Sequence, residues 1–235
     1  MKTLQSSAKN DAPPKYDKRC ARGESTRTTL VEAAVRLFGA WGYAGTSTRA
    51  IAEAAECNIG LIVFHFGSKQ GLYTAARNFV KEKLLTVIAP VTARLRVLLA
   101  ENPDKNVLIE GLYKEIFGIF KTLLPHGTEQ EHFLLLRRSL QATDAQAKAL
   151  FTEVFMPLFG VVEDILRAAA NTEEQRGRAH MATFLLIDVV IGVLRDYAVF
   201  YTGLGQPCNA QADAATLASI INAALRGNFT APERA

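Results

Sequence analysis

The chain has 235 residues, of which 49% are hydrophobic and 21% charged, a composition typical of a soluble globular protein with one large or two small domains. Its three cysteines lie far apart, which excludes a disulfide framework and a zinc cluster, and its polar N-terminus excludes an ordinary secretory signal. We therefore expect a cytoplasmic protein without a metal site or cofactor.

The positive charge is concentrated in the first third of the chain. Residues 1–80 hold 11 of the 27 Lys and Arg but only 6 of the 23 Asp and Glu, a net +5, whereas the remaining residues carry −1. A basic end suits a phosphate-bearing partner. Residues 1–23 combine charge with prolines and few apolar groups, so we predict a disordered basic arm. This arm either contacts that partner or is a solvated tail without a role.

From residue 25 the pattern becomes helical. A first helix has apolar side chains at helical spacing and ends at Gly42. Its apolar positions are Leu30, Ala34, Leu37, Phe38 and Trp41. The chain then offers hydroxyl N-caps for a second short helix at residues 46–48, and Asn58 as the N-cap of a third helix over Gly60 to His65. A fourth helix is predicted from Leu72.

The rest of the chain also reads as helix, because no stretch shows sustained period-two alternation. Prolines, Pro90 among them, mark helix ends or kinks. We predict helices near 91–101, 104–123, 128–141, 144–170, 173–203 and 211–226. Residues 181–201 are apolar almost all round, but Asp188, Arg195 and Asp196 argue against a membrane span. We expect this helix to be buried against other helices, including a second subunit.

Residues 46–62 have the anatomy of two short helices joined by a tight turn. The small Ala52 and Ala55 allow the helices to cross closely, while Ile51 and Ile62 fill the space between them. The second helix can then enter a major groove, and the hydroxyls at the start of the first suit phosphate oxygens. The sequence therefore predicts an all-α protein with a three-helix DNA-binding domain at residues 24–72. A helical bundle would follow at residues 73–235, to which the family resemblance described next assigns ligand binding and dimerisation.

Residues 25–75 contain a dense, ordered series of motifs, which are Ala33-Ala34, Leu37-Phe38, Trp41-Gly42-Tyr43, Gly45-Thr46-Ser47, Ile51-Ala52, Ala54-Ala55, Gly60, His65-Phe66-Gly67-Ser68-Lys69 and Leu72-Tyr73. Through these motifs the segment resembles the DNA-binding domain of the TetR family of repressors. This resemblance implies a sequence-specific repressor that binds a palindromic double-stranded operator as a homodimer and is released by a small-molecule effector. An activator, or an effector-independent DNA-binding protein of the same fold, is the alternative.

The resemblance implies a set of DNA contacts. Phosphate, capping and base-facing roles fall to Thr46, Ser47, Thr48, Arg49, Asn58, Gly60, Leu61, Phe64, His65 and Lys69. Packing roles remain open for Phe64 and His65. Two residues depart from the family pattern, since Glu56 stands where the family turns on glycine and Val63 where a tyrosine is common.

Residues 130–170 resemble the ligand domain of the CecR-like branch of the family, through the run from His132 to Gln141 and through Phe155-Met156-Pro157-Leu158. This implies dimerisation through the helices near 144–170 and 173–203. Aromatic and polar side chains expected to face inward suggest a pocket. The candidates are Tyr113, Phe117, Phe120, His132, Phe133, Arg137, Phe155 and Asp188. Plain core packing is the alternative for each aromatic. No catalytic motif is present, so we do not expect an enzyme.

Overall fold

The computed structural model describes residues 15–124, 130–205 and 209–229, and every regular element within these ranges is helical, which confirms the all-α prediction. The elements are α1 (Lys15–Gly45), α2 (Thr48–Ala54), α3 (Gly60–Phe66), α4 (Lys69–Ala100), α5 (Lys105–Leu123), α6 (Gln130–Gln141), α7 (Ala145–Leu150), the π-helical turn η2 (Phe151–Phe155), α8 (Met156–Ala169), α9 (Glu173–Leu204) and α10 (Ala210–Phe229).

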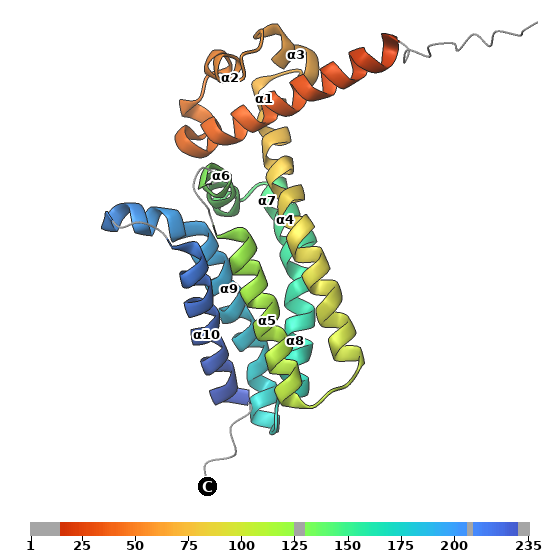
Figure 1. The fold of residues 1–235 in the computed structure, drawn as a ribbon, viewed down its shortest axis with the longest axis vertical. Helices are drawn as coiled ribbons and strands as arrows, with labels where there is room; N and C mark the ends of the chain where they lie inside the picture. Colours follow the sequence, from red (N-terminus) through yellow and green to blue (C-terminus); the bar gives the residue numbers. More distant parts are fainter. Residues whose placement is uncertain (1–14, 125–129, 206–208, 230–235) are drawn as a thin grey trace, which may run out of the picture.

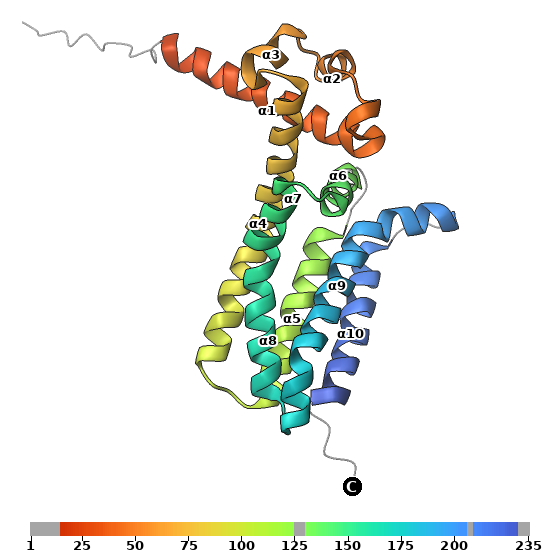
Figure 2. The same ribbon diagram turned by 180° about the vertical axis from the view of Figure 1, so that it is seen from behind.

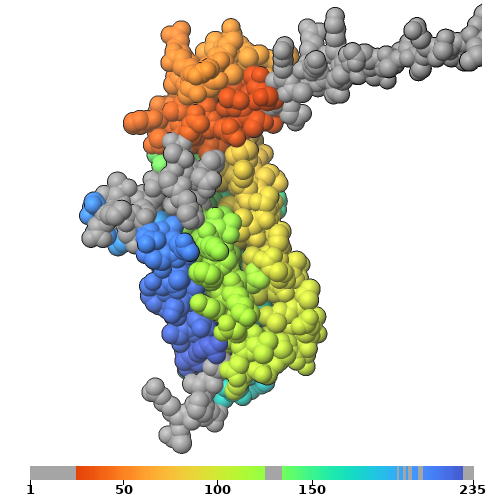
Figure 3. All heavy atoms as spheres, in the orientation of Figure 1, coloured from red at the N-terminus to blue at the C-terminus, as the bar shows by residue number. Residues whose placement is uncertain are grey.

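The helices form a small head and a longer body (Figures 1 and 2). The head consists of α1, α2 and α3, and the body consists of α5, α8, α9 and α10 running side by side with the lower part of α4. The helix α6 lies across the junction and packs against α1, α4 and α9. In the space-filling view the head caps one end of an elongated body (Figure 3).

The helix α1 begins earlier than the sequence indicated. Residues 1–14 of the predicted arm lie outside the described residues, but residues 15–23 are helical, so that part of the arm prediction is wrong. A helix that is already nucleated extends at low cost through good helix formers such as Lys, Arg and Ala. At the other end Gly42 has φ 73° and ψ 175°, so the predicted stop is confirmed as a kink. Trp41, which shares the apolar spacing of this helix, is nevertheless 68% exposed. Spacing gives the direction of a side chain, but it does not show whether another element covers it.

The helix α4 continues through Pro90, where we expected a helix end. Pro90 has no N–H to donate to the carbonyl of Thr86, but both residues are exposed, so water can satisfy that carbonyl. The predicted helix near 91–101 is therefore the end of a 32-residue rod. The rod also passes through the predicted domain boundary at residue 72, so head and body share one helix.

Two arginines connect the junction helices to the rest. Arg138 on α6 donates hydrogen bonds to the carbonyls of Gly39 (2.9 Å) and Ala40 (3.1 Å) near the end of α1. Arg77 on α4 is buried and donates to both carboxylate oxygens of Asp144, the N-cap of α7, at 2.5 and 2.9 Å. The head is thus tied to α6, and the adjoining α7 is tied to α4.

One face of α9 is left without a cover. Residues Glu173–Leu194 are long and apolar enough to cross a membrane by length and composition alone. The helix packs against α8, while Met181, Phe184, Leu185 and Val189 are exposed. The same stretch of helix exposes Asp188.

Candidate nucleic-acid interface and effector cavity

The helices α2 and α3 pack through the residues that the sequence predicted. Ile51, Ala52, Ala55 and Ile62 are all buried, and the alanines leave little side chain between the two backbones. Each helix has only seven residues, so its stability comes from this packing rather than from its own propensity. The rest of α2 and α3 is left at the tip of the head (Figures 1 and 2).

The turn between these helices uses a left-handed residue. Glu56 has φ 51°, and the N–H of Cys57 donates to the carbonyl of Ala52 at 2.9 Å, which satisfies a free carbonyl at the end of α2. Glu56 also donates its N–H to the carbonyl of Glu53 at 3.0 Å. The turn therefore has the shape that glycine favours, but it carries a side chain.

Replacing this residue gives a stability prediction. Glu56→Gly removes the left-handed strain of a Cβ and is expected to raise the free energy of unfolding by about 0.5–1 kcal/mol after the entropy cost of glycine. Urea unfolding followed by circular dichroism measures this change. The matched control is Glu53→Gly, which places glycine inside α2 and is expected to destabilise the protein. Equal losses in both variants would contradict the prediction.

The start of α2 presents polar groups, though not all those predicted. Ser47 is the N-cap, and its exposed hydroxyl accepts from the N–H of Ala50 at 3.0 Å. Arg49 is exposed and Thr48 is half-buried. Thr46 is 3% exposed and donates to the carbonyls of Leu37 (3.0 Å) and Gly42 (2.8 Å), so its phosphate contact was a wrong prediction. Its hydroxyl instead fastens the kinked end of α1.

The helix α3 presents the predicted recognition residues on two different faces. Asn58 accepts from the N–H of Gly60 at 2.8 Å, so its side chain does bind the start of α3, but the N-cap position predicted for it is occupied by Ile59. Gly60 is exposed and Phe64 is 79% exposed. Leu61 is half-buried against the core, and the base contact implied for it stays a prediction. His65 is half-buried with its ring edge-on to Phe64, 4.9 Å between centroids.

The N-terminal end of α4, which follows α3 in the chain, presents a second set of polar groups. Gly67 has φ 73° and ends α3, and the hydroxyl of Ser68 accepts from the N–H of Gly71 at 3.0 Å. A Cβ at Gly71 would lie 2.0 Å from the carbonyl oxygen of Phe66, so this close turn requires glycine. The half-buried Lys69 holds its ammonium 4.4 Å from the centre of the Tyr43 ring, a cation–π contact that orients it.

The residues predicted for an effector pocket do not come together. Phe155 lines the main apolar cavity of the body, but Tyr113, Phe117 and Phe120 do not. Arg137 forms an ion pair with Asp196 at 3.5 Å. Asp188 is exposed and does not line this cavity, so its place in a pocket stays a prediction. The side chains of His132 and Phe133 lie outside the described residues.

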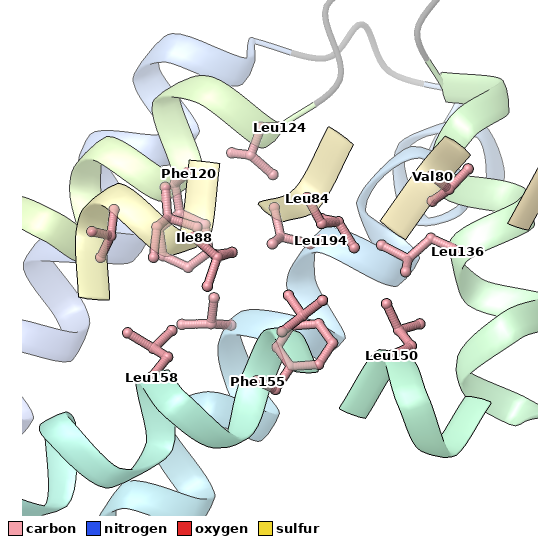
Figure 4. Close-up of a cluster of buried hydrophobic side chains, with 14 of the residues drawn as sticks. Val80, Leu84, Ile88, Phe120, Leu124, Leu136, Leu150, Phe155, Leu158 and Leu194 are labelled. Atoms are coloured by element: carbon pink, nitrogen blue, oxygen red, sulfur yellow. The ribbon is translucent and has the colours of Figure 1, made fainter. Parts of the chain in front are cut away.

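The cavity itself lies between α4, α5, α8 and α9, and its volume is about 30 Å³. Figure 4 shows part of its wall, with Leu84 from α4, Phe155 from η2 and Leu194 from α9. Glu115 is the one charged residue in a lining that is otherwise apolar. The sequence prediction missed the aliphatic wall of α4, although Leu84, Ile88, Val91 and Leu95 have helical spacing, because Pro90 was taken as a helix end. The remaining lining residues are Leu112, Ile116, Ile119, Leu123, Leu158, Val162, Leu186, Ile187, Val190 and Ile191.

Comparisons with known proteins agree with this architecture. Residues 30–76 match the family of bacterial regulatory proteins described as the tetR family. The regulator YttP of Bacillus subtilis is 44% identical over 144 residues, covering 48% of this chain and 69% of YttP. The dual regulator CecR of Shigella flexneri is 26% identical over 171 residues, covering 72% and 76%. The crystal structure of Bacillus subtilis FadR with stearoyl-CoA has a TM-score of 0.53 at 16% identity, covering 83% and 96%.

Proposed function

The chain belongs to the TetR family of bacterial transcription regulators, and from this premise we propose that it is a cytoplasmic, homodimeric repressor released from its operator by an apolar small molecule. The observation that carries the proposal is the pair of hydrogen bonds from Arg138 to Gly39 and Ala40, since they join the DNA-binding head to α6, which packs against the cavity-lining helices α4 and α9. Catalysis has no part in this function.

DNA binding is proposed to use two phosphate-binding sites, one before α3 in the chain and one after it. Ser47, Thr48 and Arg49 form the first site at the N-terminus of α2, where free amides favour an anion. Lys69 forms the second at the start of α4, held in position by the ring of Tyr43. Phosphate contacts of this kind fix the position of the head on the duplex but carry no sequence information.

The dimer is proposed to form through α9 and α10. The sequence prediction paired α9 with the helices near 144–170, but α8 buries its apolar side chains within the body. The exposed apolar face of α9 instead borders a groove of about 410 Å³ that is also lined by Ile221, Leu225 and Phe229 of α10. A membrane span would place the charged Asp188 in the bilayer, which is costly. Packing against a second copy of the chain would bury this apolar face without that cost.

The effector is proposed to be apolar because the cavity wall is almost entirely aliphatic. Small-molecule sites usually have volumes of about 300–1,000 Å³, so a cavity of about 30 Å³ has to widen when the effector enters. Phe155 ends a π-helical turn, an irregularity that is frequent at functional sites. Bacillus subtilis FadR, whose fold is similar, has a crystal structure in complex with stearoyl-CoA, which supports a lipophilic effector here.

Release follows if the widened body favours a different position of the head. An effector shifts this equilibrium only by its differential affinity for the two conformations. The helices α4 and α6 both contact the head and the body, so a change around the cavity is transmitted to α1 and α3. An activator would bind DNA through the same contacts. Effector-dependent release from DNA would distinguish a repressor or an activator from an effector-independent DNA-binding protein.

A gel shift of the full-length protein on the DNA upstream of its own gene tests the proposal. The expected result is a sequence-specific, salt-sensitive shift that the double variant Thr48→Ala, Lys69→Ala loses, since phosphate contacts dominate the salt dependence. The matched control is Thr122→Ala, Lys114→Ala, which removes the same residue types from exposed positions on α5. Absence of a specific shift with any upstream fragment, from a folded protein, would refute the proposed function.

A further inference from the structure

The outward face of α3 has no hydrogen-bonding side chain. Gly60, Val63 and Phe64 follow the i, i+3, i+4 pattern of one helix face. Ile59, directly before the helix, lies one turn before Val63 on the same side. All four are exposed, with Phe64 at 79% and Val63 at 63%. The opposite face of α3 is occupied by Ile62, which is buried, and by Leu61 and Phe66, which pack against the core.

The polar side chains next to this face are engaged within the protein. Asn58 accepts a hydrogen bond from Gly60 through its side-chain carbonyl oxygen, and the half-buried His65 stacks edge-on to Phe64. Exposed large apolar groups are ordinarily unfavourable in water, so this face is suited to an apolar partner rather than to solvent. The helices before and after α3 in the chain, α2 and α4, carry Arg49 and Lys69 in their first turns. Those charges favour a partner that is apolar at its centre and anionic at its edges.

A DNA major groove offers one apolar group with these surroundings. Among the four bases only thymine carries a methyl group on the edge that faces this groove, and that methyl is read by apolar contact. The usual pairings that read guanine, adenine and cytosine use Arg, Lys, Asn, Gln, Asp, Glu, Ser or Thr, and the outward face of α3 has none of them. We propose that α3 selects thymine at fixed operator positions through its 5-methyl group, with Phe64 as the principal contact and Val63 as the second. The inference rests on the proposed DNA-binding function.

The experiment begins with operator sites selected by the full-length protein from a random duplex library. Each conserved thymine is then replaced by deoxyuridine, which pairs in the same way and lacks only the methyl group. Burial of one methyl corresponds to about a fourfold change in affinity, so each contacted thymine is expected to weaken binding about fourfold when demethylated. Symmetric replacement in both half-sites is expected to multiply the two effects.

Alanine substitutions test which side chain of α3 contacts the thymine methyl group. Phe64→Ala is expected to bind the thymine operator more weakly and to lose most of its discrimination between thymine and deoxyuridine at one position. Val63→Ala is expected to lose part of it, at the same or an adjacent position. The control Val107→Ala removes an exposed apolar group from α5 and should keep the full wild-type discrimination. Because these positions are exposed, circular dichroism should show that all three variants remain folded.

The outcomes separate this inference from the function on which it rests. Specific operator binding with equal affinity for thymine and deoxyuridine at every position overturns the methyl readout but leaves the repressor proposal intact. Retention of wild-type discrimination in both Phe64→Ala and Val63→Ala also overturns it, because the methyl would then act through DNA shape. If the selection yields no specific site, the proposed function fails first.

Discussion

Leu185→Asp is expected to convert the proposed dimer to monomers and to weaken operator binding by a factor on the order of a hundred or more, because two half-sites are then no longer bound through one linked pair of heads. Leu185 is exposed on α9 and lines the groove toward α10. A carboxylate there would have to be buried without a partner when a second copy packs on this face, and such burial is strongly unfavourable. Analytical ultracentrifugation measures the oligomeric state, and a gel shift measures the operator affinity.

Two matched variants make this test decisive. Met156→Asp places the same charge on an exposed apolar position of α8, within the region that the sequence assigned to the interface. Val107→Asp does so on α5. We expect both to remain dimeric. If the Leu185→Asp variant is dimeric and the Met156→Asp variant is monomeric, the proposal for α9 and α10 is contradicted. The dimer interface would then include α8, as the sequence predicted.

The head was predictable because its signals are local in sequence. Gly42, the alanines of α2 and the side chain of Asn58 each act within a few residues, so spacing alone placed them. Thr46 shows where this reasoning ends. Three consecutive hydroxyls look equivalent in sequence, but the kink at Gly42 exposes carbonyls that only the first of them reaches. Which hydroxyl the protein uses internally depends on the backbone path.

The candidate effector cavity was not predictable in the same way. The sequence pattern pointed to aromatic side chains, while the wall is mostly aliphatic and built from helices far apart in the chain. Taking Pro90 as an end divided α4 and hid the regular spacing of Leu84, Ile88, Val91 and Leu95. Whether a proline ends a helix depends on whether the carbonyl it leaves unpaired can reach water, and that is a property of the fold. The exposure of Asp188 was not predictable for a related reason, since polarity does not tell which side of a helix another element covers.

Asp144→Ala is expected to lower the free energy of unfolding by about 3 kcal/mol, because it leaves the guanidinium of Arg77 buried without its carboxylate. The estimate is at the low end for such pairs since Asp144 is half exposed and water partly replaces it. The substitution also removes the N-cap of α7, where Asp144 accepts from the N–H of Ala147 at 2.9 Å. Asp144→Asn keeps the cap and should therefore cost about 1 kcal/mol less.

The pH dependence identifies the charge as the cause. The hydrogen bonds from Arg77, and then that from the backbone of Ala147, lower the pKa of Asp144 from 3.8 to about 2. A carboxyl whose folded pKa is depressed stabilises the protein fully above its unfolded value and loses that stabilisation as the pH falls from about 3.8 toward about 2. Urea unfolding at pH 6 and pH 3 should therefore show a larger difference between wild type and Asp144→Asn at pH 6. A difference that stays constant between these pH values would mean that shape and capping, not the ion pair, hold α7 to α4.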